Sequence, residues 1–335
     1  MTTAALIKSF DDEFGGNADN AMVTQFIDTG FAPLNYAISG KYDGGLPFGR
    51  LVEMFGESST GKTALATDWM RGAQEMGGAA GFIDWERSFN EGVAVDGFGL
   101  KAEKPLWFYK KPQTWEEGNT LAAKYCKWIR ENKVIKPDAP ILIVLDSIAA
   151  ALPKSMAEKE FDEYSMNDTT ALARVTSTTL KSVAQLAERF NATFLYLNQI
   201  RLKPGVVYGD PRTTPGGKAM EYYATARLAL GREKIMQQVD GSKEFVGQKI
   251  NIQCVKSKLT KPFKECSMRM SFTDEGIAMF DKEFSLIEAM LDAKKITEPS
   301  KGYVEWEGKR YSKKQMAEKA RAEGLGPKLV AMLMA

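Results

Sequence analysis

GESSTGKT, at residues 56–63, fits the pattern GxxxxGK[ST]. Before it, RLVEMFG (50–56) is a mostly apolar run typical of a buried strand, and after it KTALATDWMRGAQEM (62–76) has helical periodicity. A strand, a glycine turn and a helix in this order predict a phosphate-binding loop, because the N–H groups of the turn and of the first helical turn attract anions. The alternative, a glycine-rich turn with an incidental lysine, is disfavoured by the four matched positions and by this context.

The motif assigns roles to its residues. Lys62 can reach the β- and γ-phosphates of a nucleotide, and Thr63 can hold Mg²⁺. A second metal contact is expected where an apolar strand ends in aspartate, and ILIVLDS (141–147) supplies Asp146. We therefore expect ATP and Mg²⁺ as cofactors. The residues expected to contact the nucleotide in this loop are Gly56, Glu57, Ser58, Ser59, Thr60, Gly61, Lys62, Thr63 and Ala64.

The group that activates water must be something other than histidine, because the chain contains none. A carboxylate can act as this base. Glu86 directly follows the apolar run GFIDW (81–85), so we expect it at the same carboxyl edge of the sheet as the phosphate loop. The alternative is that Glu86 is a surface acid or pairs with Arg87.

Strand-like apolar runs alternate with helical segments over most of the chain. This alternation predicts an α/β fold with a mostly parallel central sheet flanked by helices. The runs 245–259 and 265–272 alternate between apolar and polar residues, so we expect them to extend the sheet as antiparallel strands. The near-continuous apolar runs are 50–56, 79–85, 141–147 and 192–198.

Both ends of the chain differ from this core. We expect an N-terminal helix and arm over 1–35, the nucleotide-binding core over 36–275 and a small α+β domain over 276–335. Residues 4–14 place four apolar side chains on one helical face, which predicts docking onto the core or onto another copy of the chain. Over 301–335, eight basic residues stand against four acidic ones, so the C-terminal domain is basic.

Composition excludes several classes of protein. Cys126, Cys254 and Cys266 lie far apart without a CxxC pair, so neither a disulfide framework nor a zinc site is expected. The absence of histidine removes Ser-His and Cys-His nucleophilic catalysis. There is no apolar run of membrane length, and residues 1–16 carry acidic side chains where a signal peptide has an apolar stretch. We expect a cytoplasmic protein without a membrane partner.

A long polar loop leaves the apolar run 192–198. NQIRLKPGVVYGDPRTTPGGKAMEYYATARL (198–228) begins at Asn198 and Gln199 and is rich in glycine and proline. Loops of this length without internal structure are usually functional. Four basic side chains stand against one acidic side chain over 201–218, so the expected ligand is anionic.

The order of GESSTGKT, FIDWE, IVLDS and the segment 198–228 closely resembles the RecA family of strand-exchange recombinases. LPFGRLVEMFG (46–56) and VKSKLTKPFKE (255–265) extend the likeness, which runs from about Leu46 to beyond Arg310. The resemblance implies a RecA-type P-loop ATPase core that assembles as a helical filament on single-stranded DNA. It also implies ATP bound between subunits, strand exchange with homologous double-stranded DNA, an N-terminal polymerisation arm, and single-strand-binding or mediator proteins as partners.

The resemblance also implies roles for catalytic residues. Glu86 matches the family's water-activating glutamate, and Gln199 matches the glutamine that senses the γ-phosphate at the root of the long loop. Lys256 and Lys258 match two lysines that reach the ATP of the neighbouring subunit, as an arginine finger does elsewhere. Without the resemblance, both lysines read as solvated charges on a strand.

For DNA, the resemblance implies a second DNA-binding loop at 201–217 and a first near 158–167. Cations and the N–H groups of a Gly-Gly turn can follow a phosphate chain without reading bases. The first loop is acidic, so Met166 or Tyr164 is expected to wedge between bases. Pro204 stands where the family has an apolar wedge, and Val206 is expected to replace it. The positions implied to contact DNA are Met166, Arg174, Ser177, Lys181, Arg201, Val206, Arg212, Gly216, Gly217 and Lys218.

Further departures from the family's pattern suggest a divergent member, such as one carried by a phage. Val93 replaces a tyrosine that stacks on adenine, and Asn90, which we include among the nucleotide-binding residues, replaces an aspartate. Glu221 replaces an interface lysine and Arg212 a glutamate, which suggests a compensating exchange of charge between subunits. The sequence ends without the acidic tail of many bacterial members, which predicts easier loading onto DNA.

These features predict a DNA-dependent ATPase that performs homology search and strand exchange. Two alternatives are an ATP-binding scaffold or loader on single-stranded DNA with little turnover, and a ring-forming motor of helicase type. Lys62, Glu86 and Asp146 together favour turnover, whereas the helix at 4–14 and the long loop favour a filament over a ring.

Overall fold

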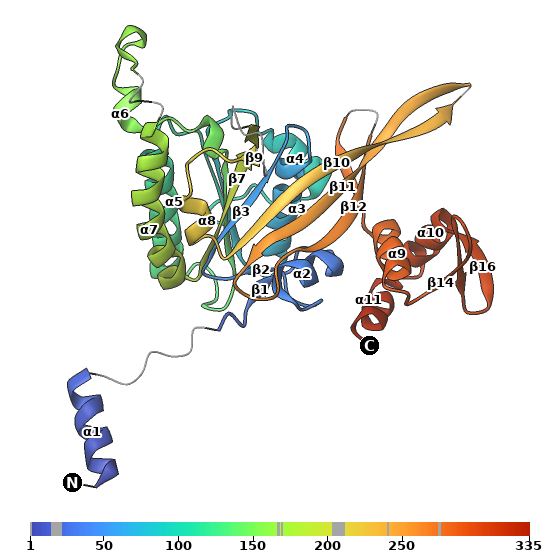
Figure 1. Ribbon diagram of the computed structural model, residues 1–335, viewed down its shortest axis with the longest axis horizontal. Helices are drawn as coiled ribbons and strands as arrows, with labels where there is room; N and C mark the ends of the chain where they lie inside the picture. Colours follow the sequence, from blue (N-terminus) through green and yellow to red (C-terminus); the bar gives the residue numbers. More distant parts are fainter. Residues whose placement is uncertain are drawn as a thin grey trace.

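A computed structural model describes residues 2–14, 22–165, 168, 170–202, 212–239, 241–273 and 276–335, with only the backbone at positions 161, 202, 212 and 239. Its centre is a nine-stranded sheet in the order β13-β12-β11-β10-β3-β7-β6-β4-β5 (Figure 1). The six strands from β10 to β5 run parallel to their neighbours, and β11, β12 and β13 add antiparallel pairs. The predicted α/β fold with a mostly parallel sheet is therefore confirmed, as is its antiparallel extension.

The strands of this sheet follow the apolar runs of the sequence closely. Strands buried on both faces need apolar side chains at every position, which is why these runs barely alternate. The bounds are β3 Leu51–Gly56, β4 Ala79–Asp84, β5 Trp107–Lys110, β6 Ile141–Asp146, β7 Ala192–Gln199, β10 Ala226–Val239, β11 Ser242–Ser257, β12 Lys264–Phe272 and β13 Ala278–Asp281.

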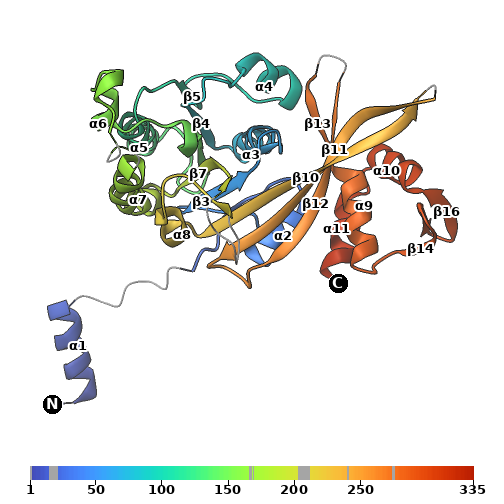
Figure 2. The same cartoon turned by 45° about the horizontal axis from the view of Figure 1, so that its top comes forward.

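Helices cover both faces of the sheet (Figure 2). One face packs against α2 (Ala32–Ser39), α3 (Lys62–Glu75) and α9 (Lys282–Asp292), and α4 (Glu91–Phe98) lies against α3. The other packs against α5 (Trp115–Glu131) and α7 (Ala171–Phe190), with the short α8 (Ala219–Tyr223) beside α7. Alternate residues of β3 enter the two separate apolar cores, since Val52 and Met54 pack on the first side and Leu51 on the second.

The register of the parallel strands brings the ends of four strands to one edge of the sheet. Gly56 of β3 lies opposite Gln199 of β7, and Asp84 of β4 lies opposite Asp146 of β6. Parallel strands end at the same edge of a sheet, where open α/β folds bind their ligands. The fold thus places the phosphate loop beside the predicted metal and sensor residues.

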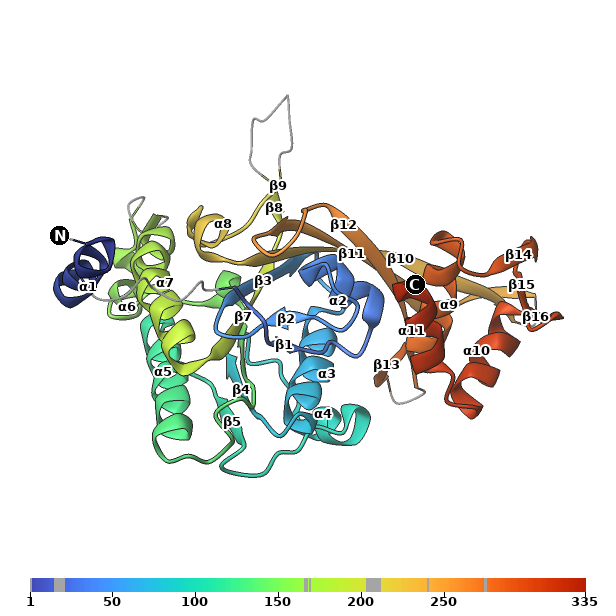
Figure 3. The ribbon, with the colours of Figure 1, turned by 90° about the horizontal axis from the view of Figure 1, so that it is seen from below.

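Smaller parts flank the core at opposite ends of the molecule (Figure 3). At one end α1 (Thr3–Phe14) keeps Leu6 and Ile7 more than half exposed. At the other end lie α9, α10 (Lys313–Ala322), α11 (Gly326–Met334) and a three-stranded antiparallel sheet of β14 (Thr297–Ser300), β15 (Tyr303–Trp306) and β16 (Lys309–Ser312). The division at 1–35, 36–275 and 276–335 remains a prediction. Within it, β1 (Phe26–Ile27) pairs with β2 (Leu46–Pro47) of the core.

Candidate nucleotide and DNA sites

The phosphate loop has the strand–turn–helix geometry that its sequence predicts. β3 ends at Gly56, and α3 begins at Lys62 directly after Gly61. Gly61 has a left-handed backbone with φ of 84°, and a Cβ there would lie 2.7 Å from Ile250 Cδ1. A Cβ on Gly56 would lie 2.6 Å from the Leu230 carbonyl oxygen. Both positions therefore require glycine, and the N-terminal end of α3 faces the loop as an anion site requires.

The lysine of the motif lies across the loop that it belongs to. Lys62 Nζ donates hydrogen bonds to the carbonyl oxygens of Gly56 at 3.1 Å and Glu57 at 2.8 Å. Burial lowers the pKa of Lys62, while Asp146 and Glu86 act in the opposite direction. An ammonium held at the mouth of the loop by backbone carbonyls can exchange those carbonyls for phosphate oxygens, which are stronger acceptors.

Thr63 and Asp146 meet as a metal site requires. Thr63 Oγ1 donates a hydrogen bond of 2.9 Å to Asp146 Oδ2. Burial, reinforced by the nearby Glu86 carboxylate, raises the pKa of Asp146 to about 7. A buried carboxylate is costly, and a hydroxyl beside a carboxylate is the oxygen donor set that Mg²⁺ prefers. These residues fit the metal that the motif implies.

Glu86 lies beside the Thr63–Asp146 pair and beside Gln199, where the long loop begins. Its Oε1 accepts hydrogen bonds from Gln199 Nε2 at 2.9 Å and from the Ser147 hydroxyl. The segments carrying these three residues are far apart in sequence and meet at the sheet edge. Of the two alternatives, Glu86 is exposed, as a surface acid would be, but its hydrogen-bond partners among the described residues are Gln199 and Ser147 and not Arg87. Ser147 was missed by the sequence analysis, although it directly follows Asp146 in the strand motif.

These groups line one pocket of about 270 Å³. Most of its lining was predicted from the sequence. Three further residues, Met270, Phe272 and Ala278, were not predicted, because they come from the antiparallel extension of the sheet. Asn90 lies outside this lining, and its Oδ1 accepts a 3.2 Å hydrogen bond from Val93 N as the N-cap of α4. The predicted residues in the lining are Ser58, Ser59, Thr60, Gly61, Lys62, Thr63, Ala64, Glu86, Asp146 and Gln199.

Lys256 and Lys258 lie away from this pocket, at the end of α8. Lys256 Nζ donates to the carbonyl oxygens of Glu221 and Tyr222, and Lys258 Nζ donates to that of Tyr222 at 3.1 Å. Burial, with the charges of Lys258 and Arg227, lowers the pKa of Lys256 to about 8. Neither lysine lines the nucleotide pocket of its own chain. Their role at the site of a second copy remains a prediction.

The predicted DNA contacts on α7 form one row. Arg174, Ser177 and Lys181 are exposed and follow one face of the helix. The glycine turn packs tightly against the same helix, because a Cβ on Gly217 would lie 3.0 Å from Ala173 Cβ. Gly216 and Gly217 both have positive φ, so the turn depends on glycine. Lys218 is exposed directly after the turn.

The long loop leaves and re-enters the fold through a small antiparallel pair. β8 (Arg201–Leu202) pairs with β9 (Arg212–Thr213), and Arg201 is exposed. Met166 and Val206 lie outside the described residues, as does the side chain of Arg212. The wedge roles predicted for Met166 and Val206 therefore remain predictions.

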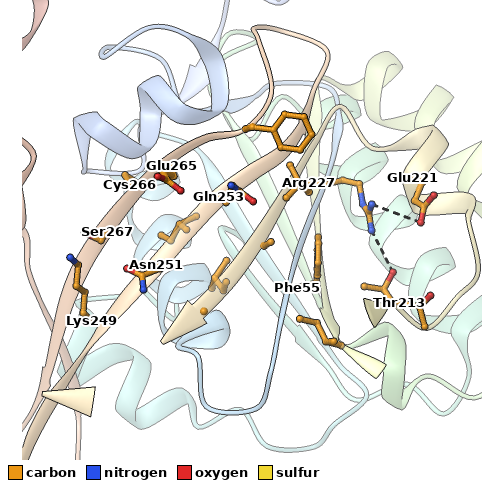
Figure 4. A pocket seen from close by; sticks show the side chains of 18 of the residues that line it. Phe55, Thr213, Glu221, Arg227, Lys249, Asn251, Gln253, Glu265, Cys266 and Ser267 are labelled. Carbon is orange, nitrogen blue, oxygen red and sulfur yellow. Dashed lines mark hydrogen bonds and ion pairs between the residues drawn. The ribbon is translucent and has the colours of Figure 1, made fainter. Parts of the chain in front are cut away.

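A second and larger pocket of about 900 Å³ lies over β10, β11 and β12, and Glu221 of α8 is part of its lining (Figure 4). Lys249, Asn251 and Gln253 project into it from β11, and Glu265 and Ser267 from β12. Arg227 stands at its border with α8, where it reaches toward Glu221. The pocket has a mixed polar and apolar lining, and it shares no residue with the nucleotide pocket.

Comparisons with known proteins agree with this geometry. A family model described as the RecA N-terminal domain matches residues 8–278. Protein RecA of Chloroherpeton thalassium is 33% identical over 278 residues, which covers 81% of this chain and 72% of the relative. Protein RecA of Chloroflexus aurantiacus is 32% identical over 282 residues, covering 82% and 74%, and that of Heliobacterium modesticaldum is 31% identical over 295 residues, covering 88% and 78%. Among the helices that the structure describes, none is both long and apolar enough to cross a membrane.

Proposed function

The chain belongs to the RecA family of DNA recombination proteins, and on that premise we propose that it is a DNA-dependent ATPase that forms helical filaments on single-stranded DNA and exchanges strands with homologous duplex DNA. The observation that carries the proposal is the convergence of Asp146, Glu86 and Gln199, from three separate segments, on one phosphate loop, whose Thr63 bonds Asp146. A passive nucleotide scaffold needs the loop but has no use for a carboxylate aligned beside it.

The nucleotide and metal are held by the phosphate loop and its neighbours. The loop N–H groups and Lys62 bind the phosphates, and Thr63 and Asp146 hold Mg²⁺, which supplies charge neutralisation at the phosphoryl group. Phe272 offers an apolar ring at the pocket wall for the base, in the place of the family's adenine-stacking tyrosine that Val93 replaces. Asn90 contributes indirectly, by capping α4.

Glu86 orients the attacking water and accepts its proton. The carboxylate is already fixed by Ser147 and Gln199, so little reorganisation is needed when substrate binds. Gln199 ends β7 where the long loop begins, so a change in that loop changes the surroundings of Glu86. Lys256 and Lys258 complete the site of a neighbouring copy, where their charges stabilise the transferred phosphoryl group.

DNA binds along α7 and the glycine turn. Arg174, Lys181 and Lys218 supply positive charge, and the N–H groups of the Gly216-Gly217 turn supply donors to phosphate oxygens. Such contacts follow a backbone of any sequence, as a search for homology requires. The α1 helix, with its exposed apolar side chains, docks onto the next copy in the filament.

Turnover with and without DNA tests the proposal. ATP hydrolysis is measured alone and with single-stranded DNA, and electron micrographs are taken with DNA and a slowly hydrolysed ATP analogue. We expect stimulated hydrolysis and helical filaments. Filaments without stimulated turnover point to the scaffold, and rings point to a motor of helicase type, so either result overturns the proposal.

A further inference from the structure

The two ends of the long loop are tied together by one buried side chain. Asn198 is fully buried at the end of β7. Its Nδ2 donates to Glu53 Oε1 at 2.9 Å and to the Pro215 carbonyl oxygen at 3.0 Å. Its Oδ1 accepts a 2.9 Å hydrogen bond from Gln199 N. One amide group therefore contacts the segment where the loop begins, the segment where it ends, and the strand that leads into the phosphate loop.

Arg227 completes this cluster from β10. Its Nε donates a 2.6 Å hydrogen bond to the Oε2 atom of Glu53, a side chain with no exposed surface. Its guanidinium lies 4.9 Å from the centre of the Phe55 ring and reaches Thr214 Oγ1 at 3.5 Å. Figure 4 shows it extending toward Glu221 of α8, 4.0 Å away. Both carboxylate oxygens of Glu53 are thus bound, one by Asn198 and the other by Arg227.

The choice of residue types shows that the cluster does more than fill the core. Burying a carboxylate is costly even when it is paired, and apolar residues of similar volume are often as stable. Here each partner of Glu53 also contacts an end of the loop: Asn198 contacts Gln199 and Pro215, and Arg227 contacts Thr214. Glu53 itself lies on β3, three residues before Gly56. The polar cluster therefore connects the loop ends to the base of the nucleotide site.

We propose that Asn198 is a positioning residue that clips both ends of the loop to β3, and that this clip transmits DNA binding at the loop to Gln199 and the nucleotide pocket. The proposal rests on the proposed function, because it assigns the loop to DNA. An amide is required at this position, since it donates to Glu53 and Pro215 while it accepts from Gln199. A carboxylate cannot donate, and an alkyl group can do neither.

Two substitutions distinguish a role of Asn198 in transmission from a role in the stability of the fold. Asn198→Asp removes the donor to Pro215 and sets two carboxylates against each other. Adding Glu53→Gln supplies an amide that donates back to the new carboxylate and still accepts from Arg227. The double variant retains one negative charge and the contact with Gln199 N. It loses the contact with Pro215, and the ion pair between Glu53 and Arg227 becomes a hydrogen bond to a neutral amide. Asn119→Ala is the matched control, because Asn119 is a buried asparagine that bonds Trp115 O and the Tyr196 hydroxyl, away from the loop.

The variants are compared by thermal unfolding, by ATP turnover with and without a thymidine oligonucleotide, and by hydrogen exchange of residues 199–202 and 212–217. In the double variant we expect an unfolding midpoint closer to wild type than that of Asn198→Asp and unchanged turnover without DNA. Stimulation by DNA should fall at least about fivefold, the lower end of typical coupling between sites. Exchange should accelerate at 212–217 while that at 199–202 stays as in wild type.

The proposal is overturned if the double variant shows the same DNA stimulation and hydrogen exchange as wild type. It is also overturned if Asn119→Ala loses as much DNA stimulation as the double variant. If hydrogen exchange at 212–217 is faster but DNA still stimulates turnover as in wild type, the clip holds the loop but does not transmit DNA binding. If the wild-type protein shows no stimulation by DNA at all, the proposed function fails. The exchange of 212–217 then decides by itself whether Asn198 holds the loop ends.

Discussion

The nucleotide pocket and the proposed DNA-binding surface of this molecule are built in opposite ways. In the pocket, side chains from separate segments meet within hydrogen-bonding distance, as Thr63 does with Asp146 and Glu86 with Gln199. On the α7 surface, Arg174, Ser177 and Lys181 are exposed and spaced along a helix. The pocket is fixed by the ends of buried strands, whereas the surface presents charge to solvent.

This difference teaches where a single substitution matters. In a site where every group has one position, the loss of one group removes a step of the chemistry. On an extended charged surface each cation contributes a similar small share of the binding, which salt screens. Effects should therefore be large in the pocket, intermediate where the site depends on a second copy, and small on α7.

The largest effect is expected for Glu86→Gln. The amide has the same size and its oxygen can still accept from Ser147, but it cannot take a proton from water. Turnover should fall by about 10²–10⁴-fold, as for loss of a general base, while ATP-dependent DNA binding remains. Turnover is measured by steady-state ATP hydrolysis, and ATP-dependent DNA binding is measured separately. Glu131→Gln on the surface of α5 is the control. Loss of DNA binding together with turnover would show that Glu86 is structural.

An intermediate effect is expected from the titration of Lys256. A lysine normally keeps its charge to about pH 10, but the lowered pKa near 8 means that this charge is lost as pH rises through 8. Besides Lys258 and Arg227, which lower the pKa, Glu221 and Glu53 face the amine and oppose this shift. The protonated fraction, and with it DNA-stimulated turnover, should fall about tenfold from pH 7 to pH 9.

Lys256→Arg is the matched variant for this prediction, because arginine stays charged throughout that range. Its DNA-stimulated turnover should be flat where the wild type declines. A decline of the same size in the arginine variant would assign the titration to another group and remove the case for Lys256 at a neighbouring site.

The smallest effect is expected for Lys181→Ala. The loss of one phosphate contact should lower the slope of log affinity against log salt by about 0.7 for single-stranded DNA, with similar loss on every sequence. Fluorescence anisotropy of labelled oligonucleotides over a range of salt measures this slope. Lys127→Ala, an exposed lysine on the neighbouring α5, is the control. An unchanged slope in Lys181→Ala would place the DNA elsewhere.

The sequence by itself determined the elements whose signals are local. GESSTGKT predicts the phosphate loop because only glycine fits its turn, and the run that ends in Asp146 predicts a strand because it is apolar throughout. Glu86 could be placed at the binding edge because parallel strands end together. The antiparallel extension followed from its alternating pattern.

Only the tertiary structure decided contacts that depend on register between distant strands. Phe272 lines the nucleotide pocket because β12 runs out beside the phosphate loop, and no periodicity in β12 shows this. Asn90 caps α4 and lies outside the lining of the nucleotide pocket, which its place in the sequence does not show. Asn198 bonds Glu53, which lies 145 positions away in the sequence, and Pro215, which lies 17 positions away. Hydrogen bonds of this kind are set by how buried strands pack side by side, which the order of residues along one strand cannot reveal.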